Sequence, residues 1–226
     1  MGAPALNAVL RRQRVTHSFS AGARVWLERG SRLHPRMTSA RMETWPKPHR
    51  LTVDDYYRMA EAGVLSPDDR TELIEGEIID MAPIGIDHAE VVRRLNRRLL
   101  RAVGDSAEVS VERPVRLSLR SEPHPDLALL KPKPSGYRRA HASAADVLLL
   151  IEVSDSTLRY DLEVKTRLYA QHAVPEYCVV DLVANRVWRH RRPGDQGYAQ
   201  RDEIQEGTLE LPVNAGAIVV PDLFTP

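Results

Sequence analysis

The continuous apolar run Val147-Leu148-Leu149-Leu150-Ile151 is the feature that most constrains the fold of this chain. A run of this length without alternation is typical of a strand buried on both faces of a sheet. Glu152 follows it directly. A carboxylate at the end of a buried strand is costly unless it meets a cation, a metal ion or several hydrogen-bond donors. The run therefore predicts a central strand that delivers an acidic group to a site.

The segment after this strand predicts a helix that extends to His172. Residues 154–157 are Ser-Asp-Ser-Thr, which are helix-capping residue types, and apolar residues then recur at helical spacing. Lys165 falls on the same apolar stripe, three residues after Leu162 and four before Tyr169. A lysine on the packed face of a helix, just after a strand that ends in glutamate, is the first indication of a functional site.

Length and composition indicate a globular protein with one domain and an appendage. The 226 residues are 42% hydrophobic and 28% charged, which is ordinary for a globular chain. The longest apolar runs are well short of the ~20 residues that span a bilayer, so no membrane association is expected. The lone Cys178 excludes an intramolecular disulfide, and residues 1–48 lack the apolar core of a secretory signal. We therefore expect a cytoplasmic protein with a buried structural thiol.

Charge divides the chain into two parts. Residues 1–50 carry ten Lys or Arg against Glu28 and Glu43, a net charge of +8, and the remaining 22 basic and 29 acidic residues give −7. Residues 1–48 show no sustained period, which predicts a disordered basic extension; an arm that binds nucleic acid is the alternative. Met37 and Met42 are possible later starts. The acidic remainder argues against strong non-specific DNA binding.

A strongly amphipathic helix is predicted from His88 to Val103. Its apolar face is formed by Val91, Val92, Leu95, Leu99 and Val103, and its opposite face by Arg93, Arg94, Arg97, Arg98 and Arg101. An arginine stripe of this kind is usually a solvated face. The other interpretation is a ridge that contacts nucleic-acid phosphates, with Arg93, Arg94, Arg97 and Arg101 as its candidate members.

The remaining elements alternate only partly between helix and strand. Thr52 caps a short helix through Ala62, and residues 72–81 read as a hairpin of two strands that pivots near Gly76. Further strands are expected at about 107–112, 115–119, 125–130, 176–181 and 187–189, and the Pro- and Arg-rich segment 131–141 as a mobile loop. This order predicts an α/β or α+β fold with a mixed sheet.

Three ionisable residues fall at element ends that can converge. Asp126 opens an apolar strand, Glu152 closes another, and Lys165 lies on the inner face of the next helix. Two carboxylates on neighbouring strands can hold Mg²⁺, and a lysine beside them can orient or deprotonate water or offset charge on a phosphate. These parts fit metal-assisted phosphodiester hydrolysis. Alternatively, Asp126 caps a turn, and Asp161 with Lys165 forms an ordinary i,i+4 helix pair.

A set of short motifs occurs in a fixed order along the chain. They are Glu72-Leu73-Ile74-Glu75-Gly76-Glu77, Met81-Ala82-Pro83, His88, Pro125-Asp126, Glu152-Val153-Ser154, Ser156-Thr157, Lys165, Tyr169, Val174-Pro175-Glu176-Tyr177 and Asp181. With these motifs the chain resembles the Uma-two family of restriction endonucleases, a branch of the PD-(D/E)XK nuclease superfamily. The resemblance covers roughly residues 51–224, nearly everything except the basic extension.

The resemblance implies a restriction-endonuclease-like domain over residues 49–226, with a mixed central sheet flanked by helices. It places the metal-binding carboxylates at Asp126 and Glu152 and the active-site lysine at Lys165. The chain departs from the superfamily's short pattern, in which the lysine lies two residues after the acid, because that position is Ser154. As in relatives whose lysine has moved to the helix, Lys165 is expected to reach the same place.

Glu72 and His88 match polar positions of the family. The resemblance allows Glu72 to be a further carboxylate ligand or to hold a metal-bound water, and His88 to contact a phosphate or transfer a proton; a helix cap is the alternative for His88. The expected function is a DNA endonuclease dependent on Mg²⁺ or Mn²⁺, with a homodimer as a plausible assembly. The alternatives are a catalytically silent module that binds nucleic acid or protein, and a phosphoesterase acting on RNA or nucleotides.

Overall fold

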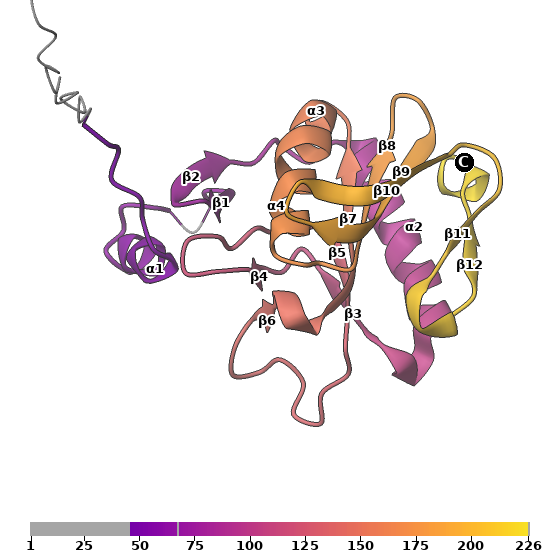
Figure 1. Ribbon diagram of the computed structural model, residues 1–226, viewed down its shortest axis with the longest axis horizontal. Coiled ribbons are helices and arrows are strands. Elements are labelled where there is room, and N and C mark those ends of the chain that lie inside the picture. Colours follow the sequence, from indigo (N-terminus) through magenta and orange to yellow (C-terminus); the bar gives the residue numbers. More distant parts are fainter. Residues whose placement is uncertain (1–45, 67, 226) are drawn as a thin grey trace, which may run out of the picture. The chain divides into compact units, whose positions relative to one another are not determined.

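The computed structural model of the protein describes residues 46–66 and 68–225 (Figure 1). The predicted disordered extension, its alternative as a basic nucleic-acid arm, and the possible later starts fall almost entirely outside these residues. The domain boundary near residue 48 therefore stays a prediction. Everything below concerns the described part of the chain.

A six-stranded mixed sheet forms the centre of the fold, in the order β10-β9-β8-β7-β5-β3. β7 and β8 are parallel, and every other neighbouring pair is antiparallel. The strands are β3 (Glu108–Val111), β5 (Leu127–Leu130), β7 (Val147–Ser154), β8 (Glu176–Asp181), β9 (Arg186–Gly194) and β10 (Gly197–Ile204). The predicted mixed sheet is confirmed, and its central strand β7 contains the long apolar run.

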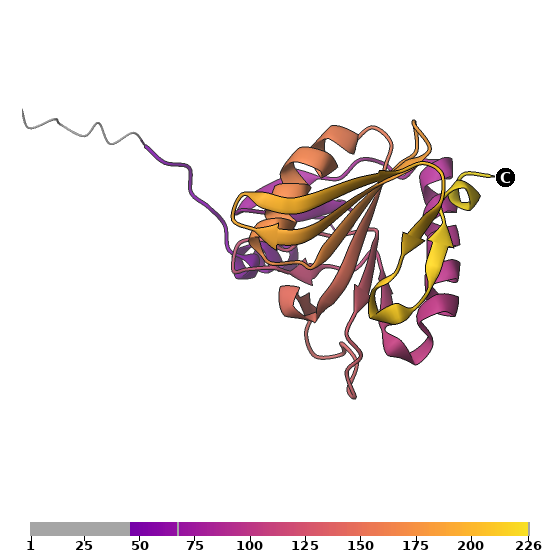
Figure 2. The same cartoon turned by 45° about the vertical axis from the view of Figure 1, so that its right-hand side comes forward.

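Helices cover both faces of this sheet (Figures 1 and 2). One face is covered by α2 (Ile86–Val103), and the other by α3 (Leu158–Tyr160), the π-helical turn η3 (Asp161–Lys165) and α4 (Thr166–Gln171). α1 (Val53–Glu61) begins at Thr52, whose side chain accepts a hydrogen bond from the backbone N–H of Asp55 and completes a capping box.

Successive residues of the central strands enter two different cores, which explains why the run is apolar without alternation. Leu149, Ile151 and Val153 pack with the apolar face of α2, whereas Leu150 packs with Leu168 and Tyr169 beyond the other face. Val147 also joins the second core, because the pairing with β5 shifts register between Val147 and Leu149. A strand side chain points to the opposite face from its neighbours, so a strand between two helical layers must be apolar at every position. The same alternation directs Glu152 to the α4 side of the sheet.

Small two-stranded ribbons and single turns surround the sheet. The ribbons are β1 (Thr71–Ile74) with β2 (Glu77–Asp80), β4 (Val115–Arg116) with β6 (Ala142–Ser143), and β11 (Thr208–Glu210) with β12 (Ala217–Val219), and the 3₁₀ turns are η1 (Gly104–Ser106), η2 (Ala144–Asp146), η4 (Pro212–Asn214) and η5 (Pro221–Leu223). The hairpin predicted around Gly76 is confirmed. Gly76 has φ +81°, and a Cβ there would lie 2.8 Å from the Cβ of Arg50.

The structure differs from the predictions at three element boundaries. The strand expected at 115–119 is limited to β4 and lies outside the central sheet. α2 begins two residues before His88, with Gly85 as its N-cap. The helix expected to reach His172 is present from Thr157, its N-cap residue, to Gln171, but its middle part, Asp161–Lys165, is a π-helical turn. No helix of the described residues is long and apolar enough to cross a membrane.

A buried histidine on β9 makes the stability of the fold depend on pH. His190 stacks on Tyr177, lies at a tilt against Tyr198, and is 3% exposed. Burial, aided by repulsion from Arg201, lowers the pKa of His190 from 6.5 to about 4. As pH falls, the histidine is protonated in the unfolded chain before it is protonated in the folded protein. The histidine therefore lowers the free energy of unfolding progressively between about pH 6.5 and about pH 4.

Replacing this histidine by phenylalanine should flatten that dependence. The free energy of unfolding of His190→Phe, measured by urea denaturation, should fall less than that of wild type when pH drops from about 7 to about 4.5, by on the order of 1–3 kcal/mol. Comparing the two proteins at each pH cancels the contribution of their shared carboxylates. Parallel stability curves would contradict the assignment.

Candidate active site

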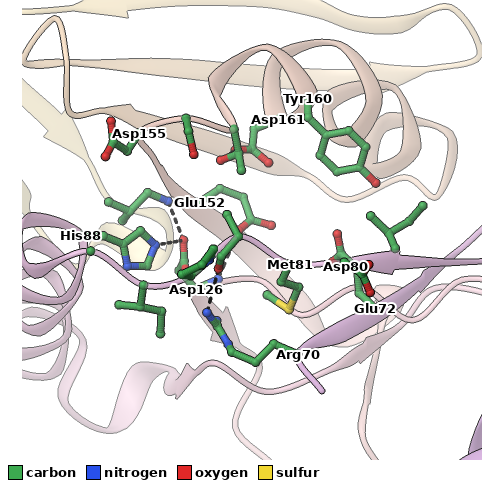
Figure 3. Close-up of a pocket in the computed structure, with 18 of the residues that line it drawn as sticks. Arg70, Glu72, Asp80, Met81, His88, Asp126, Glu152, Asp155, Tyr160 and Asp161 are labelled. Carbon is green, nitrogen blue, oxygen red and sulfur yellow. Dashed lines mark hydrogen bonds and ion pairs between the residues drawn. The ribbon is translucent and has the colours of Figure 1, made fainter. Parts of the chain in front are cut away.

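Two acidic residues meet at one end of the central sheet. The antiparallel pairing of Leu127 with Ile151 sets Asp126, just before β5, beside Glu152 in β7. The backbone N–H of Asp126 donates to Glu152 Oε2 at 3.3 Å, and the backbone N–H of Val153 donates to Asp126 Oδ2 at 2.7 Å. Figure 3 shows both carboxylates in the same cavity. The convergence expected from the sequence is therefore present.

Lys165 reaches Glu152 from the helical layer that covers this face of the sheet. Its ammonium lies 2.9 Å from Glu152 Oε1 and 3.2 Å from Glu72 Oε2, and all three side chains are buried. Tyr169, one turn further along the helix, donates its hydroxyl to Glu152 Oε1 at 2.9 Å. The backbone N–H of His124 donates to Glu72 in the same way. Both carboxylates that contact the lysine are thus held by at least one further donor.

Lys165 is the last residue of the π-helical turn, and hydrogen bonds to Asp161 hold the first residue of that turn in place. The Asp161 carboxylate accepts hydrogen bonds from the hydroxyls of Ser154 at 2.7 Å and Thr157 at 2.8 Å, and its backbone carbonyl accepts from Tyr177. Within the described residues no ion pair joins Asp161 to Lys165, so the alternative of an ordinary i,i+4 pair is wrong. π-Helical turns are rare in proteins overall, and those that occur often lie at functional sites. Ser154, where the superfamily's short pattern has its lysine, anchors this turn instead.

His88 joins the site from the first turn of α2. Its Nε2 lies 3.2 Å from Asp126 Oδ2. The hydrogen bond with Asp126 raises the pKa of His88 against the opposing effect of burial, and the charge of Glu112 raises it further. Because Gly85 is the N-cap residue, His88 does not cap the helix. It restrains the orientation of the Asp126 carboxylate.

Negative charge exceeds positive charge at the centre of the site. Although burial alone would lower the pKa of Lys165, the attraction of Glu152, Glu72 and Asp161 raises it well above its ordinary value. Burial also raises the pKa of Glu152, and Lys165 offsets this while the neighbouring carboxylates add to it. Three carboxylates around a single ammonium favour the binding of a further cation.

One cavity of about 150 Å³ is lined by all five candidate site residues, Glu72, His88, Asp126, Glu152 and Lys165. It has room for several water molecules. Its walls are the 79–85 segment and the 155–161 segment. The cavity also includes residues that were not predicted as part of a site, namely Arg70, Asp155, Tyr160 and Asp161.

Comparison with known proteins identifies the family. The family model of Uma2, described as "Putative restriction endonuclease", matches residues 53–218. The chain belongs to the Uma2 family. The resemblance expected from the sequence motifs is therefore confirmed, and the match includes every residue that lines the cavity.

The fold of this Uma2 chain is also found in a solved structure. A crystal structure of a "putative nuclease belonging to DUF820" from Anabaena variabilis is similar with a TM-score of 0.59 and 15% sequence identity. The similarity covers 77% of this chain and 97% of that one. No curated protein matches the chain. At this identity the comparison shows a shared fold, which confirms the predicted nuclease-type architecture.

The carboxylates of the Uma2 site fit a hydrated Mg²⁺. Among the described residues, no three His, Cys, Asp or Glu side chains are arranged to hold a metal ion. Mg²⁺ is usually bound by only one or two carboxylates, with water and substrate oxygens completing its shell. Asp126 and Glu152 provide that number, and Asp126 Oδ1 forms no hydrogen bond within the described residues.

The arginine stripe on α2 is partly neutralised. Arg93 and Arg94 both pair with Glu90, and Arg98 lies 3.2 Å from Asp222. Arg97 and Arg101 are exposed and form no ion pair within the described residues. Contact with nucleic acid stays a prediction for Arg93, Arg94, Arg97 and Arg101, and the last two carry the charge that is accessible to a ligand.

Proposed function

We propose that this Uma2 protein is a metal-dependent endonuclease that hydrolyses phosphodiester bonds in DNA. The observation that supports it best is the convergence of the buried Asp126, Glu152 and Lys165 side chains on one cavity. Membership of a family described as restriction endonucleases supports hydrolysis of nucleic acid. Dependence on Mg²⁺ or Mn²⁺ and the choice of DNA are parts of the proposal.

The residues divide the chemistry between them. Mg²⁺ or Mn²⁺ bound at Asp126 and Glu152 would supply Lewis acidity and a more acidic water. Lys165, whose pKa the surrounding carboxylates raise, donates hydrogen bonds to Glu152 and Glu72 and would orient a water molecule beside them. Glu72 positions the ammonium of Lys165, and His88 positions the carboxylate of Asp126.

A cleavage assay tests this proposal. Plasmid and oligonucleotide DNA would be incubated with wild type and Asp126→Ala in Mg²⁺, in Mn²⁺ and in EDTA. Wild type should cut in either metal and not in EDTA, and Asp126→Ala should lose at least about a thousandfold in rate because its metal site is removed. Asp68→Ala, which changes an exposed aspartate on a surface turn, is the matched control and should cut like wild type.

One observation favours a catalytically silent module as the second candidate. Both oxygens of Glu152 are already engaged by Lys165, Tyr169 and the Asp126 backbone, so the cluster can stabilise itself without a metal ion. Binding of DNA without cleavage in any divalent metal would support this candidate. Cleavage of RNA or nucleotides alone would support a phosphoesterase. Homodimerisation and a cytoplasmic location stay predictions, and sedimentation would test the former.

A further inference from the structure

Arg70 lies at the entrance of the cavity but has no role in the chemistry described above. It directly precedes β1, two residues before Glu72, and Figure 3 shows it beside Asp126 and Met81. Its Nη1 donates to the backbone carbonyl of Ala82 at 2.9 Å. This contact holds the guanidinium against the 79–85 segment, so Arg70 is fixed at the cavity and does not extend freely into solvent.

The charge of Arg70 is available to a ligand. Within the described residues Arg70 forms no ion pair, whereas Lys165 is enclosed by Glu72 and Glu152. The Arg70 side chain is exposed. A guanidinium has five N–H donors in a planar fork, and the contact with Ala82 engages only one side of it. Arg70 therefore combines a fixed position with donors that remain open.

Two hollows meet at this residue. The second hollow shares four residues with the cavity that contains the candidate site: Arg70, Met81, Ile84 and Asp126. Its other lining residues are Tyr56, Asp69, Thr71, Glu112 and His124. Asp69 and Glu112 give the second hollow negative charge, so a phosphate next to the one at Asp126 would be held at the junction beside Arg70 and not deeper in that hollow. An arginine at such a junction suits a phosphate, because its fork matches two phosphate oxygens.

We propose that Arg70 is a substrate-binding residue that holds the phosphate adjacent to the one at Asp126 and Glu152. This inference rests on the proposed function in one respect, that the ligand is a phosphodiester chain. It adds a binding subsite formed by the residue before β1 and the 79–85 segment. The contact with Ala82 sets the direction of the guanidinium before the substrate arrives, which reduces the entropy lost on binding.

Direct binding separates this subsite from catalysis. Fluorescent single-stranded and duplex oligonucleotides would be titrated in EDTA and, separately, in Ca²⁺, with wild type, Arg70→Gln and Arg70→Lys. Glutamine removes the charge, and lysine keeps the charge without the fork. Arg70→Gln should weaken binding about ten- to a hundredfold and reduce the salt dependence of log Kd by about one. Arg70→Lys should be intermediate. Arg120→Met, an exposed arginine outside both hollows, should bind within about twofold of wild type.

Each outcome decides the inference. Equal binding by Arg70→Gln and wild type, or a wild type that binds no oligonucleotide, would overturn it, and a lowered melting temperature with unchanged binding would assign Arg70 a purely structural role. Inorganic phosphate and mononucleotides that bind as tightly as oligonucleotides would overturn the adjacent-phosphate assignment. Arg70-dependent binding by a wild type that cleaves nothing would support the subsite while refuting the nuclease. Cleavage by Arg70→Gln with an unchanged KM would support the nuclease while refuting the subsite.

Discussion

Replacing Lys165 with methionine should abolish cleavage and also destabilise the fold by about 3–5 kcal/mol. Lys165 is 4% exposed, and its ammonium is the charge that both Glu72 and Glu152 contact, so its removal leaves two buried carboxylates without a counter-ion. Methionine fills a similar volume, which limits the cavity contribution.

Urea denaturation across a range of pH checks this prediction. Burial raises the pKa of Glu152, and without the lysine the attraction that offsets this increase is lost. A raised carboxylate pKa removes stability as pH increases, so the deficit relative to wild type should be largest near about pH 8 and shrink towards about pH 5. Lys47→Met, which removes an exposed lysine, is the control and should leave stability within about 0.5 kcal/mol. A deficit independent of pH would show that Lys165 acts through packing alone.

Replacing Glu152 with glutamine should abolish cleavage but, unlike the Lys165 substitution, leave the stability of the fold nearly unchanged. Cleavage should fall by at least about a thousandfold, because a neutral amide is a poor ligand for Mg²⁺ and the site loses one of its two metal-binding carboxylates. The fold should keep its stability within about 1 kcal/mol. Glutamine preserves the shape and can still accept from Tyr169, and Lys165 keeps Glu72 as its counter-ion.

Cleavage rates, melting temperatures and isothermal titration with Mg²⁺ together test the Glu152 prediction. Titration should detect binding to wild type and none to Glu152→Gln. Glu61→Gln, an exposed glutamate on α1, is the matched control and should behave as wild type in all three measurements. A Glu152→Gln protein that cuts DNA at the wild-type rate would remove Glu152 from the mechanism. Loss of folding would instead show that the charge itself is structural.

The acid–lysine cluster could be predicted from sequence because strong local patterns fix its parts. The apolar run of residues 147–151 identifies β7, and Glu152 directly follows that run. Helical spacing then puts Lys165 on the inward-facing stripe of the next helical segment. Strand pairing then brings Asp126 to the same edge. Only the family resemblance pointed to Glu72 and His88, and the structure places both within hydrogen-bonding distance of the cluster.

Other parts of the site depend on contacts that no local pattern encodes. The π-helical turn depends on a carboxylate that Ser154 and Thr157 approach from outside the helix, so helical periodicity could not reveal it. Arg70 reaches the cavity through a hydrogen bond to Ala82, twelve residues away. Its position directly before the Glu72 strand was the one available signal. The length of β4 was overestimated from the sequence, because its partner β6 extends over only two residues and pairs with only two residues of β4.

Placing the lysine on a helix and the carboxylates on a sheet gives the site two separate supports. Glu152 and Asp126 are held by the strands, whereas Lys165 is held by a segment that packs against them through side chains. A small separation of the two layers would move the ammonium away while leaving the acids in register. Activity would then be lost on heating before the sheet unfolds, and the temperature optimum would report the packing of one short helical segment.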